Sequence, residues 1–581
     1  MNKTKIIATL GPQSQSVEEI YSLIQAGMNV ARINLSHGDA ESYKHLISNV
    51  KEARKLAEKD TAILLDNRGP EIRVSEMEED IHLVDGEELV ITNRAETVSP
   101  SRITTNYPQL AGDVQVGSRI LLDDGKLALE VLAIEDEEVI TKVIAGGILS
   151  SRKRVALPDN EVNLPSLSEK DKEDIAFGVE QDVDFIAASF VRQAGDVWAV
   201  RKIIEDNGGD QEIIAKIENR QGVNNLDEIL QAANGIMVAR GDLGVEVPAE
   251  EVPIIQKSII KAANRLGKPV ITATQMLESM ITCPTPTRAE ANDVTNAIFD
   301  GTDAVMLSGE TAIGKYPVQA VAFLVRCATI AENALDYDHI LANGLQNRRP
   351  TITDSISYAS CATAADLKAT AIITATSSGS TARMVARYRP KAPVIAVSPS
   401  PSTIRHLQLI RGVTPLLCNF GSSMDEQLDR VIHAATLAEL IHNGDLVIIT
   451  AGMPLGPTGT TNMLKVHTVA DICVTGQGIG VKHAQGAVRI IQAEDDWQDL
   501  PEHTIAVVSS TNESMLKHLG KVRGIIAEAP GLTSHAAIVG RELGIPVICN
   551  VTNALMLFEN DQVITIDGTT GHICYGSTQN T

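Results

Sequence analysis

The chain has 581 residues, of which 44% are hydrophobic and only 3% aromatic, and its formal net charge is −24. This length exceeds what one hydrophobic core can organise, so we expect three or four domains of an α/β protein. The acidic balance argues against nucleic acid as a partner, because phosphate backbones are bound by clustered Lys and Arg.

Cysteine usage and hydropathy predict a cytoplasmic protein. The seven cysteines are odd in number, scattered and never in C-x-x-C spacing, so neither a disulfide framework nor a zinc site is expected. The N-terminus runs into a strand pattern without the long apolar segment of a signal peptide. No segment approaches the run of about 18 apolar residues that a membrane span needs, so we expect no membrane partner.

Short apolar runs that end in polar or glycine-rich turns recur eight times in the first half of the chain. Near-continuous apolar runs are typical of parallel strands buried on both faces. Most of the segments between them have helical periodicity, and eight β/α units are the number in a (β/α)8 TIM barrel. The runs are residues 5–11, 28–34, 61–66, 183–189, 212–217, 235–240, 269–274 and 303–308.

The third and fourth runs are separated by a long stretch of short alternating segments. Turn sequences such as Val84-Asp85-Gly86 interrupt it. This pattern predicts a small β-barrel domain, residues 70–163, inserted in a βα loop of a catalytic barrel made of residues 1–69 and 164–343. Because βα loops lie on the catalytic face of such barrels, we expect the insert to act as a lid.

Two further α/β units follow the barrel. A polar link at residues 346–350 opens the first, residues 344–475, whose apolar strands again alternate with helices. A glycine-rich segment, residues 476–480, opens the second, residues 476–581. We find no internal repeat and no low-complexity tract.

Polar residues gather where the predicted barrel strands end, which is where barrel enzymes hold their catalytic groups. Glu218 and Asp242 follow adjacent strands, and magnesium or manganese prefers a few carboxylates together with substrate oxygens. Arg32 and Lys216 would neutralise phosphoryl charge. A helix N-cap or a surface ion pair explains any one of these residues, but not the whole set. The other members are Asn34, Ser36, Asp66, Ser189, Arg240 and Thr274.

Eight segments between residues 5 and 317 carry a specific resemblance. Together and in this order they resemble pyruvate kinase, a family that transfers a phosphoryl group from phosphoenolpyruvate to ADP and gives pyruvate and ATP. The segments are KIIATLGP, ARINLSHG, LLDNRGPEIR, AKIENRQG, MVARGDLGVE, TATQMLESM, TRAEANDV and MLSGETAIGKYP.

The resemblance implies roles for the residues at the strand ends. Arg32 would bind the phosphate to be transferred, and Lys216 would stabilise its charge in flight. The Gly241 backbone and Thr274 would hold the substrate carboxylate, and Thr274 would help to protonate the enolate. The resemblance further implies that Glu218 and Asp242 ligate Mg²⁺ and that Ser189 and Asp242 contact substrate. It implies nucleotide contacts by Arg73, Lys153, His37 and Asn34.

A potassium site is also implied by the resemblance. Its ligands would be Asn34, Ser36, Asp66 and the carbonyl of Asn67, where the family holds Thr. Glu71 resembles the glutamate of potassium-requiring members, and its charge would need a nearby monovalent cation. Arg68 and Val74 depart from that type.

The lid contains a larger departure from the family. Where the family often reads KKGVNLPG, residues 152–159 read RKRVALPD. The loss of two glycines predicts a stiffer turn and unusual lid kinetics, and it weakens the assignment of Lys153 to nucleotide binding.

A hydroxyl-rich loop in the third unit is a candidate effector site. Hydroxyls and N–H groups at a helix start can bind phosphate. The loop lacks a Walker Gly-Lys-Ser/Thr, and an ordinary N-cap run is the alternative. In pyruvate kinases the matching loop binds a sugar-phosphate or nucleotide activator. The residues are Thr376, Ser377, Ser378, Gly379, Ser380 and Thr381.

The last hundred residues hold GLTSHAA at 531–537, followed by RELGIP at 541–546. These motifs are similar to the phosphohistidine domain of phosphoenolpyruvate-utilising enzymes, an extension that some bacterial pyruvate kinases carry. His535 at a helix start could accept a phosphoryl group. Nothing in the chain resembles the ATP-grasp domain or carrier protein that such enzymes need, so we favour a structural or regulatory role.

We therefore expect a pyruvate kinase that uses Mg²⁺ (or Mn²⁺) and K⁺, and the resemblance implies a homotetramer with a phosphorylated activator. Two alternatives remain. One is a phosphohistidine-dependent synthase or dikinase working through His535. The other is a non-catalytic regulatory protein that keeps the fold.

Overall fold

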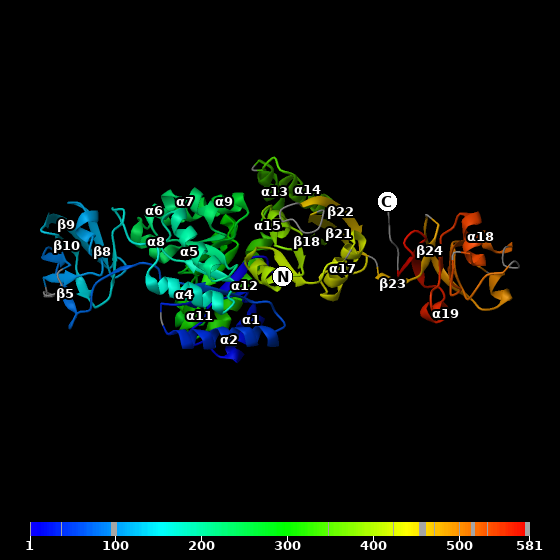
Figure 1. Ribbon diagram of the computed structural model, residues 1–581, viewed down its shortest axis with the longest axis horizontal. Helices are drawn as coiled ribbons and strands as arrows, with labels where there is room; N and C mark the ends of the chain where they lie inside the picture. Colours follow the sequence, from blue (N-terminus) through cyan, green and yellow to red (C-terminus); the bar gives the residue numbers. More distant parts are fainter. Residues whose placement is uncertain are drawn as a thin grey trace. The chain divides into compact units, whose positions relative to one another are not determined.

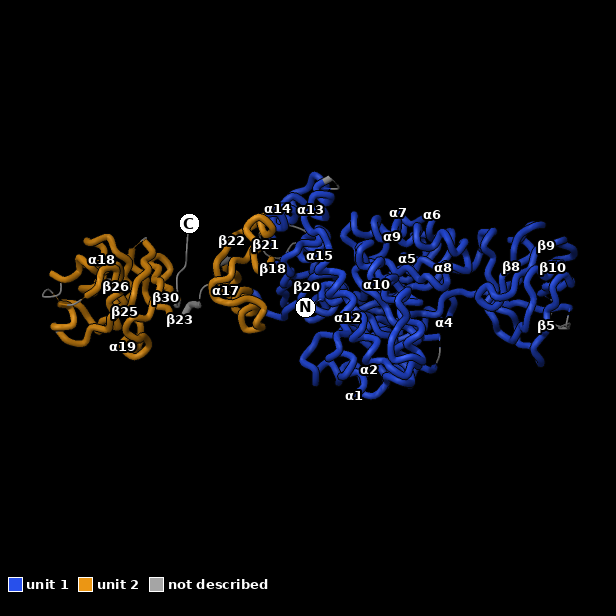
Figure 2. The backbone as a smooth tube through the Cα atoms, turned by 180° about the vertical axis from the view of Figure 1, so that it is seen from behind, with its two compact units in different colours: residues 1–362, 374–420, 450–463 blue, residues 363–373, 421–449, 464–581 orange. Residues whose placement is uncertain are grey.

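The computed structural model is shown in sequence colours in Figure 1. Its Cα positions divide into two compact units (Figure 2). Unit 1 comprises Met1–Ala362, Thr374–Phe420 and Thr450–Met463, and unit 2 comprises Thr363–Ile373, Gly421–Ile449 and Leu464–Thr581. The described residues are 2–36, 38–93, 101–346, 348–421, 423–452, 461–469, 471–480, 482–498, 500–512, 517–531 and 533–575.

Eight parallel strands of unit 1 close into a barrel in the order β1-β17-β16-β15-β14-β13-β3-β2. The predicted (β/α)8 barrel is thus confirmed, and each predicted run contains one strand. The strands are β1 (Lys5–Thr9), β2 (Val30–Asn34), β3 (Ala62–Asp66), β13 (Phe185–Ala188), β14 (Glu212–Ile217), β15 (Gly235–Ala239), β16 (Val270–Ala273) and β17 (Ala304–Leu307).

Both faces of these strands are buried, which explains their continuous apolar sequence. Ile6 and Ala8 of β1 belong to a large apolar cluster that also contains helix residues. Ile7, between them, belongs to a second cluster with Phe185 and Met237 from other strands. Because successive side chains point to opposite faces, each strand supplies both the barrel interior and the layer beneath the helices.

Helices lie outside the strands (Figure 1). The first, α1 (Val17–Ala26), begins at a capping box in which Ser16 and Glu19 bond to each other's backbone. It ends at Gly27, where φ is 116° and a Cβ would lie 2.6 Å from Val325. The others are α2 (Ala40–Leu56), α4 (Glu169–Glu180), α5 (Ala194–Asp206), α6 (Arg220–Asn224), α7 (Leu226–Ala232), α8 (Arg240–Glu246), α9 (Val252–Leu266), α10 (Arg288–Asp300), α11 (Gly309–Ala312), α12 (Pro317–Asn333) and α13 (Tyr337–Gln346).

A β-rich insertion lies between β3 and β13. Seven of its strands form one sheet in the order β4-β12-β8-β9-β10-β6-β7, and β11 pairs with β5. The insertion has its own apolar core, which includes Leu89, Ile120 and Leu129. Its elements are β4 (Ile72–Arg73), β5 (Ile81–Leu83), β6 (Glu88–Thr92), β7 (Arg102–Thr104), α3 (Leu110–Asp113), β8 (Arg119–Leu122), β9 (Leu127–Glu135), β10 (Glu138–Ala145), β11 (Gly147–Leu149) and β12 (Arg154–Ala156).

The segment after α13 contains a five-stranded sheet in the order β20-β19-β18-β21-β22. Strands and helices alternate along it, as the sequence predicts for an α/β domain. Its elements are α14 (Ile352–Asp366), β18 (Ala371–Ala375), α15 (Ser380–Ala386), β19 (Val394–Ser398), α16 (Pro401–His406), β20 (Val413–Leu417), α17 (Met424–Leu437), β21 (Leu446–Gly452) and β22 (Thr461–Thr468).

The C-terminal part of the chain forms an eight-stranded sheet in the order β23-β30-β29-β25-β26-β27-β28-β24. Strands β25 to β28 run parallel, and β29 and β30 add an antiparallel edge. Its elements are β23 (Asp471–Thr475), β24 (Gln477–Ile479), β25 (His483–Ile491), β26 (Thr504–Val508), β27 (Val522–Ala527), α18 (His535–Leu543), β28 (Val547–Cys549), α19 (Ala554–Leu557), β29 (Val563–Asp567) and β30 (His572–Tyr575).

Within the described residues, no single helix has the length and apolar character to cross a membrane. By length and composition alone, Pro317–Asn333 and Tyr337–Leu345 meet the criterion only as a pair bent by 73°.

Candidate active site at the carboxyl ends of the barrel strands

Lys216 is the centre of a buried charged network at the strand ends. Its Nζ lies 2.8 Å from Ser189 Oγ, 3.2 Å from Asp66 Oδ1 and 2.9 Å from Glu218 Oε1. Arg32 reaches the same network, since its Nε donates to Asp66 Oδ2 at 2.7 Å. The five residues of this network are each less than 10% exposed, and they lie on or directly after four neighbouring strands. They are Arg32, Asp66, Ser189, Lys216 and Glu218. The structure therefore brings together the predicted phosphoryl-binding cations and one predicted metal ligand.

The charges in this network shift the pKa values of Asp66, Lys216 and Glu218. Burial alone would raise the pKa of Asp66, but Lys216 and Arg32 outweigh it and lower that pKa. Burial opposes the charge of Lys216, yet Asp66 and Glu218 raise its pKa above the usual value. Lys216 is thus held as a cation at any physiological pH.

Glu218 is the least compensated member. Its Oε2 accepts a hydrogen bond from Phe190 N at 2.6 Å, whereas Oε1 is buried and receives no hydrogen bond of good geometry, although it is ion-paired with Lys216. Burial raises the pKa of Glu218 to about 7, partly offset by Lys216. A buried carboxylate oxygen with an unused lone pair has the chemistry of a ligand for a hard cation.

Strained backbone positions two of the contacts at the site. Phe190 has φ 54°, which an aromatic residue rarely adopts, and this conformation accompanies its amide bond to Glu218. Thr274 and Gln275 follow β16 with φ 66° and 56°. Thr274 Oγ1 accepts from Gly241 N at 2.9 Å, which links the ends of β15 and β16. The two predicted carboxylate-binding groups are therefore adjacent.

Asp242, the second predicted metal ligand, forms an ion pair with an arginine of the β-rich insertion between β3 and β13. Arg154 Nη1 lies 2.5 Å from Asp242 Oδ1, and Nη2 lies 3.4 Å from Glu246. The Arg154 guanidinium also stacks 4.7 Å from the centre of the Phe190 ring, and its side chain is only 9% exposed. Burial would lower the pKa of Arg154, but Asp242, Glu246, Glu218 and Glu71 raise it. Sequence reasoning missed this residue: it noted the lost glycine but not the charge that replaced it.

The predicted potassium ligands lie on adjoining segments at the ends of β2 and β3. Asn34 Oδ1 accepts from Ser36 N at 3.1 Å, and Asn67 O accepts from Ser189 Oγ at 2.8 Å. The Asn67 side chain adds contacts that the sequence did not suggest, since it donates to Asp171 and accepts from Ser189 N. Amide, hydroxyl, carboxylate and carbonyl oxygens form a donor set that suits a hard cation.

The predicted nucleotide-binding residues of the lid are held in ion pairs within the lid. Arg73 binds Glu71 Oε2 through Nε at 2.8 Å and Nη2 at 2.5 Å, and Lys153 lies 2.7 Å from Asp123. His37 lies outside the described residues. Within those residues, no group of three or more His, Cys, Asp or Glu side chains is arranged to hold a metal, so substrate oxygens or water would have to complete the coordination.

The predicted effector loop joins β18 to α15. Ser377 and Ser378 are exposed, whereas Thr376 and Thr381 are buried. Gly379 has φ 80° directly before the helix, a conformation that glycine adopts without strain. Thr381 Oγ1 lies 2.8 Å from Thr461 Oγ1. In the C-terminal sheet domain, His535 is the first residue of α18, as the sequence suggested, and its Nδ1 lies 2.9 Å from Thr511 Oγ1.

Comparison of the sequence with known proteins identifies the family of each part of the chain. Residues 1–321 match the family described as pyruvate kinase, barrel domain, and residues 354–467 match pyruvate kinase, alpha/beta domain. Residues 500–571 match the family described as PEP-utilising enzyme, mobile domain. Three curated relatives, each named pyruvate kinase, align over 99% of both chains. They are from Geobacillus stearothermophilus at 52% identity, Bacillus licheniformis at 48% and Staphylococcus aureus at 45%. The chain therefore belongs to the pyruvate kinase family of phosphotransferase enzymes.

Proposed function

We propose that this protein transfers the phosphoryl group of phosphoenolpyruvate to ADP, giving pyruvate and ATP, at the carboxyl ends of the barrel strands. The observation that carries the proposal is the buried network of Lys216, Asp66, Arg32 and Glu218. Two fixed cations beside an under-coordinated carboxylate are suited to a substrate that brings both a phosphate and a metal ion.

Different residues of the site would bind the phosphoryl group, bind the substrate carboxylate and deliver the proton. Arg32 and Lys216 bind the phosphoryl oxygens and hold positive charge where negative charge moves during transfer. The Gly241 N–H, which donates to Thr274 Oγ1 at 2.9 Å, would bind the substrate carboxylate together with Thr274. The Thr274 hydroxyl, which donates to Ala273 O at 2.7 Å, would turn to the substrate and deliver a proton to the enolate. Ser189, bonded to Lys216, fixes the direction of that ammonium group.

Glu218 and Asp242 fit a divalent ion, because the Oε1 atom of Glu218 is ion-paired with Lys216 but accepts no hydrogen bond of good geometry, and Asp242 is a partly exposed carboxylate. Mg²⁺ or Mn²⁺ bound there would supply positive charge to the phosphoryl oxygens and orient the substrate. Asn34, Ser36, Asp66 and the Asn67 carbonyl would hold K⁺. Arg73 and Lys153 would exchange their lid partners for nucleotide phosphates, joined by His37 and Asn34.

The proposed location, oligomeric state, domain roles and activator rest on the resemblance to the family. We propose a cytoplasmic homotetramer built from the barrel at 1–69 and 164–343, the lid at 70–163, an effector domain at 344–475 and a phosphohistidine-like domain at 476–581. A sugar phosphate or nucleotide would activate the enzyme at the loop from Thr376 to Thr381. The exposed hydroxyls of Ser377 and Ser378 at a helix start support that site.

A coupled assay of ATP formation from phosphoenolpyruvate and ADP, with Mg²⁺, K⁺ and a panel of sugar phosphates, tests the proposed reaction. Turnover that requires both substrates supports it. Tight binding of metal and substrate without any turnover would instead identify a non-catalytic homologue.

Potassium dependence provides a second test. Replacing K⁺ by tetramethylammonium is expected to lower the rate by at least about tenfold, because Glu71 leaves the phosphate pocket short of positive charge. In Glu71→Lys the dependence should nearly vanish, since the lysine supplies that charge. Glu76→Lys is the matched control: Glu76 is another lid carboxylate, but its side chain is 75% exposed and paired with Arg152. If both variants keep the dependence of the natural chain, Glu71 does not set it.

The C-terminal domain allows a test of the second candidate function, phosphoryl transfer through a histidine. His535→Ala is expected to leave the rate of ATP formation within about twofold, because His535 is half-buried in the C-terminal sheet domain and is not one of the residues proposed to carry the transfer. Incubation with labelled phosphoenolpyruvate should give no acid-labile adduct. An adduct in the natural chain that His535→Ala removes, together with loss of turnover, would favour a synthase or dikinase.

A further inference from the structure

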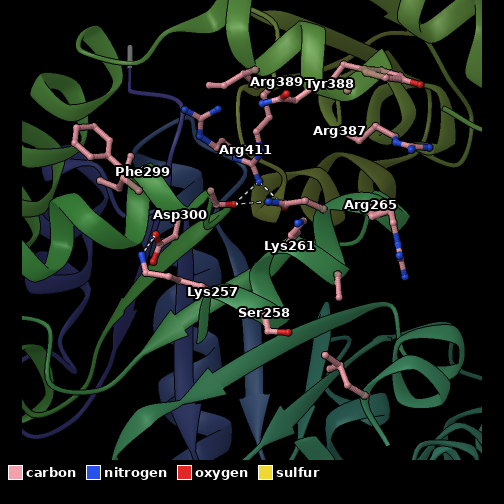
Figure 3. Close-up of a pocket in the computed structure, with 18 of the residues that line it drawn as sticks. Lys257, Ser258, Lys261, Arg265, Phe299, Asp300, Arg387, Tyr388, Arg389 and Arg411 are labelled. Carbon is pink, nitrogen blue, oxygen red and sulfur yellow. Dashed lines mark hydrogen bonds and ion pairs between the residues drawn. The ribbon is translucent and has the colours of Figure 1, made fainter. Parts of the chain in front are cut away.

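A large cavity lies beside helices α9, α10 and α13, and none of its lining residues belongs to the site at the carboxyl ends of the barrel strands. Its volume is about 890 Å³, within the range of pockets that enclose small molecules. It is lined by the C-terminal parts of α9 and α10, which lead into the amino ends of β16 and β17, and by α13. Residues 387–389 and Arg411 complete the wall, and Figure 3 draws Arg389 and Arg411 on the side of the view opposite Lys257 and Ser258 of α9.

The cavity is strongly basic in an acidic protein. Its described lining includes six basic side chains but only two acidic ones, Asp227 and Asp300, whereas the whole chain carries a net charge of −24. Concentrated charge of one sign in a cavity attracts a ligand of the opposite sign. The six are Lys257, Lys261, Arg265, Arg387, Arg389 and Arg411.

Part of this charge is satisfied within the protein. Lys257 pairs with Asp300, and Arg387 lies 2.8 Å from Asp354. Arg389 donates through Nη2 to Asn264 at 2.6 Å, and its nearest carboxylate is Asp303 at 3.4 Å. Arg265 lies 3.8 Å from Asp227. These pairs do not use every donor.

Arg411 is the least compensated of the six. It is 4% exposed, and although it interacts with the Tyr337 hydroxyl, its Nε and Nη2 atoms have no hydrogen-bond partner among the described residues. Arg389 Nη1 is buried without a partner as well, and Lys261 has no ion pair with any described side chain. Buried guanidinium groups are normally paired, so Arg411 and Arg389, which both line the cavity, hold positive charge that the described side chains leave partly unmatched, and an anionic ligand would match it.

Titration shifts at the same wall agree with uncompensated positive charge. Burial lowers the pKa of Arg389 to about 10, against the opposing effect of Asp303 and with that of Arg411. Arg411 thus adds to the effect of burial on the pKa of Arg389, and an anion bound beside both would oppose that effect.

We propose that this cavity binds a small phosphate-bearing anion through Arg411, Arg389 and Lys261, as a site separate from the loop at residues 376–381. Guanidinium groups pair with phosphate in a planar, two-bonded geometry, and a lysine adds a point charge. The volume accommodates a sugar phosphate or a nucleoside monophosphate. The ligand would contact both the barrel helix α9 and Arg411 before β20.

Calorimetric titration of the full-length chain without divalent metal tests this site. The probes are inorganic phosphate, glucose 6-phosphate and AMP at constant ionic strength. Ser378→Glu places a negative charge on the exposed loop and is used as the background, so that binding at residues 376–381 is blocked. In this background we expect at least one probe to bind, and Lys261→Met added to it to weaken that binding by at least about tenfold.

Lys261 is exposed, so its replacement leaves folding intact, and the exposed Lys202→Met in α5 is the matched control. Arg411→Met, with folding checked by circular dichroism, should abolish binding. Tighter binding of the organic probes would identify a metabolite as the ligand, and equal binding of inorganic phosphate would identify free phosphate. No binding in the Ser378→Glu background, or equal binding by Lys261→Met and Lys202→Met, would overturn the proposal whatever the enzyme's turnover.

Discussion

Replacing Lys216 by methionine is expected to lower the rate of ATP formation by about 10²–10³-fold, because the main fixed charge for the transferring phosphoryl group is removed. The ammonium group touches Asp66, Ser189 and Glu218, and no other described lysine reaches this network. Methionine keeps the length and the apolar stem of the side chain. Steady-state kcat and KM for phosphoenolpyruvate, measured with saturating Mg²⁺ and K⁺, give the result, and the loss should appear mainly in kcat.

The thermal stability of Lys216→Met has to be measured alongside its kinetics. The substitution removes an ion-pair partner from two buried carboxylates, Asp66 and Glu218. Asp66 keeps Arg32, and Glu218 takes up a proton readily because its pKa is raised to about 7. We therefore expect the variant to remain folded, with a lower Tm. Lys202→Met, at an exposed position of α5, is the control for losing a lysine elsewhere on the barrel. A folded Lys216→Met enzyme with a kcat near that of the control would refute the role of this residue.

Arg154→Gly is expected to raise the affinity for Mn²⁺ and Mg²⁺ by about tenfold, which corresponds to about 1.4 kcal/mol. Arg154 and a divalent ion compete for the same carboxylate, since the guanidinium lies 2.5 Å from Asp242 Oδ1. Two unit charges about 4 Å apart interact with about 4 kcal/mol at the effective dielectric constant of a partly closed site. The removal of the Arg154 charge can therefore account for the expected change of about 1.4 kcal/mol. Direct Mn²⁺ titration followed by electron paramagnetic resonance measures the affinity without turnover.

The lid offers a close control for this effect. Arg152→Gly removes the same charge two residues away, where the side chain is 70% exposed and paired with Glu76. It should leave Mn²⁺ affinity unchanged, whereas Arg154→Lys, which keeps the charge, should stay close to the natural chain. Equal Mn²⁺ affinity in Arg154→Gly and Arg152→Gly would show that the arginine does not compete with the metal.

The barrel and most of its site could be predicted because their signals are local. A strand such as Lys5–Thr9 is buried on both faces, so its apolar run is visible without knowing its neighbours. The catalytic groups follow such runs directly, and parallel strands bring their carboxyl ends together whatever the loops do. Lys216 and Glu218 could therefore be placed beside Arg32 although 184 residues separate Lys216 from Arg32 in the chain.

The missed contacts depend on how separate segments pack. Arg154 and Asp242 are 88 residues apart, and their contact exists only because a lid strand approaches α8. The sequence showed the substitution of a family glycine but suggested only a stiffer turn. Arg411 likewise looks like one more basic residue in the chain; its missing partners are visible only after α9 and the segment before β20 form one cavity.

The convergence of Glu218 and Asp242 on one divalent ion is tested most directly by Mn²⁺ titration of Glu218→Gln and Asp242→Asn, followed by electron paramagnetic resonance. Both variants keep the shape of the side chain and remove its charge. Each should bind Mn²⁺ at least about tenfold more weakly than the natural chain. In the natural chain, affinity should also fall as the pH drops through about 7, because protonation of Glu218 removes a ligand. Mn²⁺ affinity equal to that of the natural chain in both variants would place the ion elsewhere and contradict the proposed site.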